Sequence, residues 1–214
     1  MNSTYSGAHS VRRRQSETQR GGLAETASPS SAPGSHWAHL LGSAGNQARR
    51  AGAAGQVGAR AHKADVDSFR ALISRISESE PVRLYDAVEE GVPTAILGLM
   101  ASALCTNTTA MLSLLNISET TFRRKEEAKE PFPDAAGYRV MGLLRVASTL
   151  RRLLKESGDP KQLENFDFEG WVSEWIAQPQ PELGGRPAAE LLRNPEGQRV
   201  VEQLLERMRG GLPA

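Results

Sequence analysis

The sequence has a single cysteine, few aromatic residues and no long apolar run. Cys105 is the one cysteine among 214 residues, which excludes an intramolecular disulfide and a zinc site built from several cysteines. The longest strongly apolar stretch, residues 95–105, is far shorter than the roughly 20 residues that a membrane-spanning helix needs. The sequence therefore argues against a membrane protein and against a disulfide-built secreted protein, and a reducing, cytoplasmic location is expected.

Histidine is missing from the part of the chain that the pattern predicts to fold. The four histidines, His9, His36, His39 and His62, all lie in the first 62 residues. Without histidine, the predicted folded part has no Ser–His or Cys–His nucleophile pair and no histidine metal site. Cys105 lies in an apolar stretch and is predicted to be an inert core thiol. We expect no catalytic residues, no metal, no cofactor and no enzymatic activity, and a helical enzyme ranks last among the functions considered.

The charge of the chain is unevenly distributed. The 26 basic and 25 acidic residues nearly cancel, but residues 1–63 hold eight Lys/Arg and only two Glu. Residues 1–62 also contain twelve Ala, nine Gly and nine Ser but only eight large apolar residues, too few to offset the entropy of ordering them. This composition predicts a disordered basic N-terminal arm over residues 1–62, able to attract phosphates non-specifically. An organelle transit peptide and a start codon assigned too far upstream are alternative explanations of such a tail.

Beyond the arm, apolar residues recur with helical spacing. Val66, Phe69, Ile73 and Ile76 share one helical face, and the longest apolar stripe runs from Val140 to Leu154. Prolines and glycines interrupt the pattern around residues 81, 131–134, 157–160 and 179–187. No convincing alternating pattern of a β-strand is present. The sequence predicts an all-α fold with two modules after the arm, residues 63–157 and residues 158–214.

Residues 108–128 have the pattern of a helix-turn-helix. Asn116 tolerates a left-handed turn, Ile117 fills the corner, and Ser118 is predicted to cap a second helix. That helix carries residues suited to a DNA surface: Thr120, Thr121, Arg123, Arg124 and Lys125. An ordinary corner between two helices gives the same pattern, and residues 119–130 hold four acids against four bases. DNA binding is therefore a prediction with only weak support from charge.

The last 57 residues contain two tryptophans and several strong helix signals. Trp171 and Trp175 either fill the space between two helices or form part of a protein-binding surface, where tryptophan is enriched. The sequence Asn194-Pro195-Glu196 supplies a cap, a first-turn proline and a first-turn acid for a final helix. Gly210-Gly211 ends that helix.

In this order, the motifs resemble those of the Xre/MbcA/ParS antitoxin family. The C-terminal segment carries the resemblance most specifically, with the letters WVSEWIAQPQPELGGRPAAELLRNPEGQRVVEQLLERMRGG. The segments VPTAILGLMASALC, LLNISETTFRRK and RVMGLLRVASTLRRLL resemble the helix-turn-helix part of the family more loosely. Residues 1–62 match nothing in the family.

The resemblance implies an antitoxin of a type II toxin–antitoxin system. Such antitoxins pair with a RES-domain toxin, which consumes NAD by degrading it or by transferring ADP-ribose to a target protein. The resemblance implies that residues 158–214 bind the toxin and that the last residues block its NAD site. It further implies that residues 63–157 form the helix-turn-helix and dimerisation domain. The homodimer would be part of a toxin–antitoxin hetero-oligomer, and some members of the family bind operator DNA and repress their operon. The alternative function is a stand-alone helix-turn-helix transcriptional regulator.

The resemblance also assigns residues to toxin binding. They belong to the tryptophan helix, the glycine turn and the end of the last helix: Trp175, Leu183, Gly184, Gly185, Arg186, Arg207, Arg209, Gly210 and Gly211. Together with Pro187 and Gly197, Trp175 and the residues 183–185 are expected to hold the shape of the module. Arginines at a protruding helix end can pair with the catalytic acids of an NAD cleft. The helix dipole, which also favours cations at this end, is the competing explanation of Arg207 and Arg209.

Overall fold

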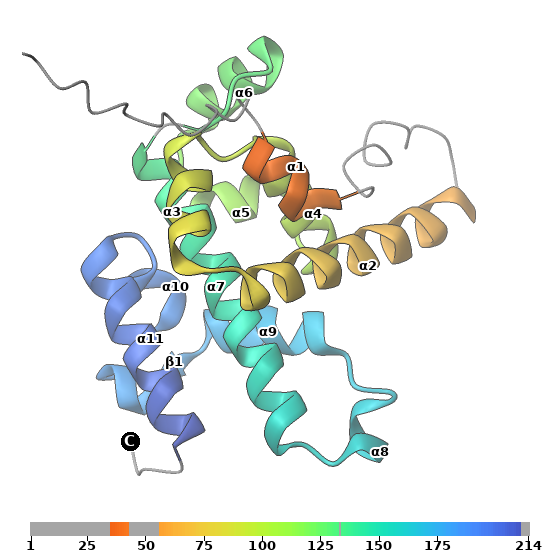
Figure 1. The fold of residues 1–214 in the computed structure, drawn as a ribbon, viewed down its shortest axis with the longest axis vertical. Coiled ribbons are helices and arrows are strands. Elements are labelled where there is room, and N and C mark those ends of the chain that lie inside the picture. Colours follow the sequence, from red (N-terminus) through yellow and green to blue (C-terminus); the bar gives the residue numbers. More distant parts are fainter. Residues whose placement is uncertain (1–34, 43–55, 133, 211–214) are drawn as a thin grey trace, which may run out of the picture. The chain divides into compact units, whose positions relative to one another are not determined.

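The computed structural model describes residues 35–42, 56–132 and 134–210. These residues are mostly helical, which confirms the predicted all-α fold (Figure 1). The helices of the N-terminal three quarters are α1 (Ser35–Leu41), α2 (Gln56–Glu78), α3 (Pro81–Glu89), α4 (Ala95–Ala103), α5 (Thr108–Leu114), α6 (Glu119–Ala128) and α7 (Asp134–Ser157). They are followed by α8 (Pro160–Leu163), α9 (Phe168–Ala177), the 3-10 turn η2 (Pro181–Leu183), α10 (Ala188–Leu191) and α11 (Pro195–Arg209).

Two very short strands add the β-structure that the sequence pattern did not predict. Strand β1 (Pro179–Gln180) pairs antiparallel with β2 (Arg186–Pro187), so that Pro179 lies opposite Pro187 and Gln180 opposite Arg186. Strands of two residues are too short to show an alternation of apolar and polar residues. The pair closes the turn that contains the two glycines Gly184 and Gly185.

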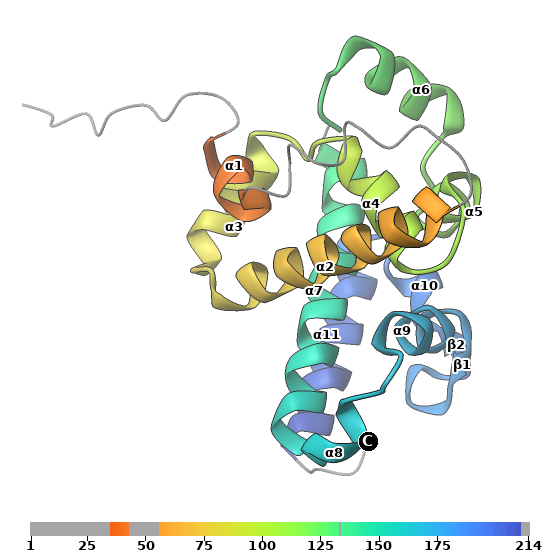
Figure 2. The same ribbon diagram turned by 90° about the vertical axis from the view of Figure 1, so that its right-hand side faces the viewer.

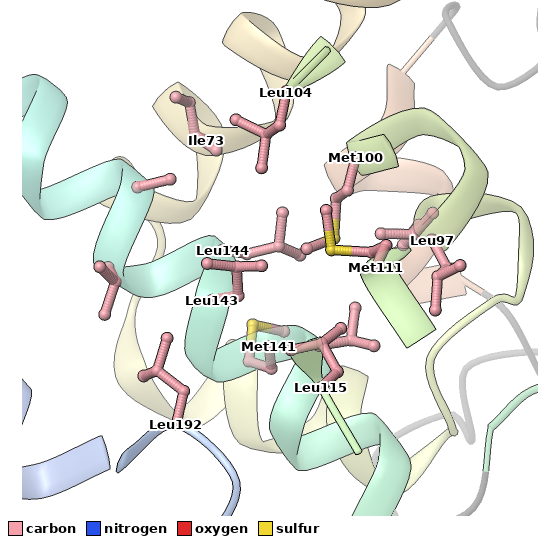
Figure 3. Packing of buried hydrophobic residues seen from close by; sticks show 14 of the residues in the cluster. Ile73, Leu97, Met100, Leu104, Met111, Leu115, Met141, Leu143, Leu144 and Leu192 are labelled. Atoms are coloured by element: carbon pink, nitrogen blue, oxygen red, sulfur yellow. The ribbon is translucent and has the colours of Figure 1, made fainter. Parts of the chain in front are cut away.

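Helix α7 lies at the centre of the packing. It contacts α2 and α3, which precede it in the chain, and α9 and α11, which follow it (Figure 2). Helix α2 also packs on α4. Figure 3 shows Met100 of α4, Met111 of α5 and Leu144 of α7 meeting in this core, with Leu192 approaching α7 from the C-terminal segment. One buried cluster thus includes side chains of both predicted modules, and the independence of residues 63–157 and 158–214 stays a prediction.

The predicted extent of the disordered arm needs correction. Helix α1 and the first turns of α2 fall within residues 1–62, and Trp37 and Leu40 of α1 are buried in the core. The Trp37 indole Nε1 donates a hydrogen bond of 2.6 Å to the carbonyl oxygen of Ala87. Composition averaged over 62 residues concealed this short apolar motif. The rest of the predicted arm, residues 1–34 and 43–55, lies outside the described residues.

The prediction that Cys105 is a buried thiol is wrong. Cys105 follows Leu104, the residue that caps α4, and takes a left-handed conformation with φ of 54°. This reversal of the chain leaves Ala103 and Leu104 in the core and turns Cys105 toward solvent. An apolar run that extends one residue past the end of its helix therefore misled the prediction.

None of the helices in the described ranges is, by itself, both long and apolar enough to span a membrane. Only α4 and α5 taken together, as a pair bent by 102°, reach that length and composition.

Candidate functional site

The segment predicted to be a helix-turn-helix consists of two helices around a left-handed turn. The Asn107 side chain caps α5 by accepting a hydrogen bond from the Ala110 amide. Asn116 then takes φ of 52°, and Ile117 is buried at the corner, as the sequence predicts. Ser118 occupies the position before α6, but its side chain makes no capping hydrogen bond, so the predicted side-chain cap is wrong. The local geometry is compatible with a helix-turn-helix, and DNA binding stays a prediction.

Helix α6 exposes most of its surface and carries the five residues predicted to contact DNA. It is anchored by Phe122, which is buried and whose ring lies 6.1 Å from that of Phe132. Two of its cations are already paired: Arg123 with Glu119 at 2.6 Å, and Lys125 with Glu130 at 2.9 Å. The Lys125 ammonium, through this hydrogen bond, lowers the pKa of the Glu130 carboxyl.

Arg124 is different from its neighbours on α6. It is exposed, and within the described ranges it makes no ion pair or hydrogen bond. Thr120 is also exposed and Thr121 is half-buried. Among the predicted DNA-contacting cations, Arg124 is therefore the one that would not have to break an ion pair with a described carboxylate in order to contact DNA.

The tryptophan helix α9 is built as the sequence predicts but exposes part of both tryptophans. Its Asp167 cap accepts a hydrogen bond from the Gly170 amide, and Phe168, Val172 and Ile176 are buried. Trp171 and Trp175 pack on this core from its edge and remain half-buried. Each indole therefore contributes to the core, as one interpretation of the sequence predicts, and a protein-binding role of the exposed part of each ring stays a prediction.

An open cavity of about 820 Å³ lies beside α9 and the end of α4. Phe166 and Trp171, whose ring centroids are 5.9 Å apart, form its aromatic wall, while Asp167 and Glu174 add two carboxylates. Cys105 also lines this cavity, and its Sγ atom is 3.9 Å from His62 Nε2.

The prediction that the folded part contains no histidine is wrong, since His36, His39 and His62 all lie on described helices. Among the described residues, no group of three or more His, Cys, Asp and Glu side chains could hold a metal ion.

The glycine turn, Gly184-Gly185, is exposed and follows a buried leucine. Leu183 is buried, whereas Gly184 and Gly185 are exposed and have φ of 68° and 75°, values that favour glycine. Their amides donate to the carbonyl oxygens of Pro181 and Gln180, both at 3.0 Å. Arg186 follows, exposed and 3.9 Å from Glu190. The backbone of the two glycines and the Arg186 side chain are therefore exposed to solvent, while the buried Leu183 side chain anchors the turn to the core.

Helix α11 begins with the cap that the sequence predicts. The Asn194 side chain accepts a hydrogen bond of 2.9 Å from the Gly197 amide, with Pro195 and Glu196 in the first turn. Gly197 is buried so tightly that a Cβ atom there would overlap the carbonyl of Leu191. Val201, Leu204 and Leu205 bury the inner face of the helix, which contacts α7.

Ion pairs tie most charges of α11 to α7 or to each other. Glu202 pairs with Arg145 at 3.1 Å and Glu206 with Arg152 at 3.4 Å. Arg209 lies 3.4 Å from both Glu156 and Glu206. These contacts hold Arg209 along the surface of the protein.

Arg207, by contrast, is exposed and has no ion pair or hydrogen bond in the part of the chain that the structure describes. Gly210, which caps α11, is exposed as well, and Gly211 lies outside the described residues. Of the two assigned arginines at the end of α11, Arg209 is paired, whereas Arg207 has no partner among the described residues. No sequence pattern distinguished them, because the partner Glu156 of Arg209 is 53 positions away on α7.

Comparison with known proteins assigns this C-terminal region. Residues 166–211, from two residues before α9 to two residues after α11, match the family model of the antitoxin Xre/MbcA/ParS C-terminal toxin-binding domain. The chain is also similar to the "Prs ADP-ribosylating antitoxin" of Sphingobium sp. (strain YBL2), with 31% identity over 133 residues. That alignment spans 62% of this chain and 82% of the relative. The chain belongs to the Xre/MbcA/ParS antitoxin family.

Membership of this family confirms the resemblance drawn from the sequence motifs. The protein is an antitoxin of a toxin–antitoxin system, and its toxin-binding domain is C-terminal. All the residues that the sequence assigned to toxin binding, from Trp175 to Gly211, lie inside the matched range, whereas the α6 residues 120–125 lie outside it. Membership of this antitoxin family favours a regulatory role through binding over a catalytic role.

Proposed function

We propose that this antitoxin neutralises a RES-domain toxin by placing the end of α11 in the toxin's NAD site. The name of the Sphingobium relative supports a toxin of the ADP-ribosylating kind. Such a toxin consumes NAD as its ADP-ribose donor. The antitoxin itself supplies no chemistry in this proposal. It acts in the cytoplasm as a homodimer within a toxin–antitoxin hetero-oligomer.

The observation that carries the proposal is that the Arg207 guanidinium is exposed and has no partner among the described residues. An NAD-consuming site holds catalytic carboxylates, and a guanidinium forms paired hydrogen bonds with a carboxylate. Arg207 lies in the last turn of α11, three residues before the exposed cap Gly210. The end of α11 thus presents an exposed guanidinium and an exposed glycine, which suit contact with such a site.

The helix dipole alone does not account for this arrangement. A cation in the last turn is favoured whether it is at position 207 or at position 209. The difference between the two side chains is that Arg209 is held by Glu156 and Glu206, whereas Arg207 is exposed and unpaired among the described residues. This contrast supports a role for Arg207 outside its own chain.

The glycine turn and Trp175 supply a second part of the proposed toxin surface. Gly184, Gly185 and Arg186 are exposed, and η2, which precedes them, contacts α11. Trp175 is half-buried, and its carbonyl oxygen accepts a hydrogen bond of 3.0 Å from Gln180, which leads into this turn. Leu183 is buried, so its contribution is to hold the turn rather than to contact the toxin.

Co-expression of the antitoxin with its cognate RES-domain toxin tests the proposal. Deletion of residues 207–214 is expected to leave the antitoxin folded, by circular dichroism, but to release toxicity, read as colony survival. Arg207→Glu is expected to release toxicity too, and Arg209→Gln to preserve protection. Full protection by the truncated antitoxin would remove the helix end from the mechanism.

Autorepression through α5 and α6 is the second proposed function. It is supported by the left-handed turn at Asn116 and by Arg124 on α6, which is exposed and forms no ion pair with any residue that the structure describes. Because α6 is nearly neutral, the basic residues before α1 would supply part of the attraction to operator DNA. A stand-alone transcriptional regulator would use the same helices without a toxin, and a RES-type reading frame beside the gene would argue against it.

A further inference from the structure

The cavity beside α9 lies mostly within the toxin-binding domain. Seven of its ten lining residues belong to residues 166–177, at the start of the range that the family model matches, and the other three are Leu104, Cys105 and Asn165. None of the described residues that the sequence assigned to toxin binding lines it. The cavity is therefore a second feature of this domain, formed by other residues than the end of α11 and the glycine turn.

One side of α9 faces the cavity. The α9 residues of the lining recur at intervals of three, one and three positions, which places them on one side of a helix: Gly170, Ser173, Glu174 and Ala177. The residues that seat the helix on the core, Phe168, Val172 and Ile176, are not among them. Glycine, serine and alanine have short side chains, so open space remains beside the larger Trp171 ring.

Aromatic rings and carboxylates line this space together. The rings of Phe166 and Trp171 are 5.9 Å apart, and both side chains are half-buried. Asp167 and Glu174 are exposed, and each accepts one hydrogen bond of 3.0 Å from its own helix or cap. Among the described residues that line the cavity, none is Lys, Arg or His.

The cations near the cavity do not pair with these two carboxylates. The charge of Asp167 acts on Arg70, but the Arg70 guanidinium is held by two hydrogen bonds to Glu169. His62 contacts Cys105 at 3.9 Å and forms no ion pair with a described residue. The negative groups of the cavity are therefore not neutralised by an ion pair within the part of the chain that the structure describes.

This combination of groups selects for a cation. A guanidinium or ammonium group is attracted to the face of an indole ring, and a neighbouring carboxylate accepts its hydrogen bonds. A phosphate or carboxylate ligand would instead be repelled by Asp167 and Glu174. Interfaces are enriched in tryptophan and arginine at the positions that contribute most to affinity, and a half-buried Trp171 in a toxin-binding domain has that character.

We propose that the cavity beside α9 receives an arginine or lysine side chain of the toxin, with Trp171 against its stem or face and Asp167 and Glu174 as its acceptors. This inference rests on the proposed function, because it gives the same toxin a second contact. The complex then uses charges of both signs. Arg207 approaches carboxylates of the toxin, while a cation of the toxin enters the α9 cavity, and the two contacts together fix the orientation of the partners.

The affinity of the antitoxin for its purified toxin tests the cavity. Asp167→Asn/Glu174→Gln removes both charges but keeps the side-chain sizes and the start of α9, since asparagine also caps helices. This variant is expected to raise the Kd of the complex about tenfold, because charge pairs in the interface are lost, and to weaken its dependence on salt. Glu127→Gln/Glu164→Gln is the matched control, since it neutralises two exposed acids outside the cavity. Cavity variants with the Kd and salt dependence of the control would overturn the proposal.

Charge reversal at Glu174 tests whether the occupant is a basic side chain. Glu174 is exposed, so Glu174→Lys is expected to keep the circular dichroism spectrum of the wild type and to bind toxin more weakly than the neutral variant. Each surface arginine and lysine of the toxin is then replaced by glutamate in turn. One such toxin is expected to recover affinity for Glu174→Lys, because the pair is restored with its charges exchanged. Recovery by none of them would show that no basic side chain of the toxin occupies the cavity.

Inhibition at saturation separates this inference from the proposed function. The Asp167→Asn/Glu174→Gln antitoxin retains Arg207, so at concentrations well above its Kd it is expected to suppress NAD consumption as fully as the wild type. Cavity variants that bind as tightly as the wild type would contradict the cavity alone. Full suppression by Arg207→Glu would contradict the proposed block of the NAD site alone, and failure of the wild type to bind toxin would contradict both.

Discussion

Arg70 of α2 holds Glu169 of α9 with two hydrogen bonds, Nε to Oε1 at 2.7 Å and Nη2 to Oε2 at 2.6 Å. The Glu169 carboxylate is nearly completely buried, with 3% of its side chain exposed, and the hydrogen bonds to it raise the pKa of the Arg70 guanidinium. Arg151 of α7 donates to the Arg70 carbonyl oxygen at 2.7 Å. The start of the toxin-binding domain is therefore fastened to a helix 99 positions earlier in the chain.

Replacement of Glu169 by Gln is expected to lower the free energy of unfolding by about 2 kcal/mol. Loss of one member of a buried pair costs roughly 3–5 kcal/mol, and partial exposure of Arg70 reduces that cost. Urea unfolding followed by circular dichroism measures it. Glu190→Gln, which removes an exposed pair with Arg186, is the control and should change the value by less than about 0.5 kcal/mol. Equal changes in the free energy of unfolding for the two replacements would show that the buried pair stabilises the protein no more than the exposed one.

Replacement of Trp37 by Ala is expected to destabilise the protein by about 3–5 kcal/mol, as removal of a large buried aromatic side chain does elsewhere. Deletion of residues 1–34, which keeps α1, is expected to leave the midpoint of thermal unfolding unchanged. A truncation at residue 62 would remove Trp37 and Leu40 together and so confuse the loss of an arm with damage to the core. An unchanged stability of the Trp37 variant would contradict the packing of α1.

Glycine replacements separate the shape of the toxin-binding domain from its surface. Gly197→Ala places a methyl group against the Leu191 carbonyl, so this variant is expected to lose the ordered α10–α11 corner and toxin capture together. At Gly184 the φ of 68° is unfavourable for alanine, by about 1–2 kcal/mol, but space is open. Gly184→Ala is therefore expected to remain folded by circular dichroism. A well-folded Gly197→Ala protein would show that the corner rearranges easily.

Binding to operator DNA is expected to depend on Arg124 and on the residues before α1. Arg124→Ala is expected to weaken binding to operator DNA more than Arg123→Ala does, because Arg123 is already paired with Glu119. Deletion of residues 1–34, which contain four arginines, is expected to flatten the dependence of affinity on salt, since fewer counterions are released. Titration by fluorescence anisotropy at several salt concentrations measures both. A truncated protein with an unchanged salt slope would exclude a contribution of the arm.

The sequence predicted most of the elements of the toxin-binding domain because their signals are local. The cap at Asn194, the first-turn Pro195 and the glycine turn at 184–185 each depend on residues within a few positions. The resemblance to the family rests on the same local series, which the match over residues 166–211 confirms.

Long-range features were beyond such reasoning. The burial of Glu169 depends on Arg70, and the burial of Trp37 depends on α3, through Ala87. Arg207 and Arg209 appear equivalent in sequence, and only the carboxylate of Glu156 on α7 distinguishes them. Composition and periodicity carry no information about which distant side chain will supply a partner.

NAD consumption by the purified toxin, with and without this antitoxin, tests the central claim most directly. The wild-type antitoxin is expected to form a stable complex and suppress NAD consumption. Arg207→Glu is expected to relieve that suppression at least tenfold, while Arg209→Gln leaves it intact. Separate elution of toxin and antitoxin, with NAD consumed at the same rate in both samples, would contradict the account.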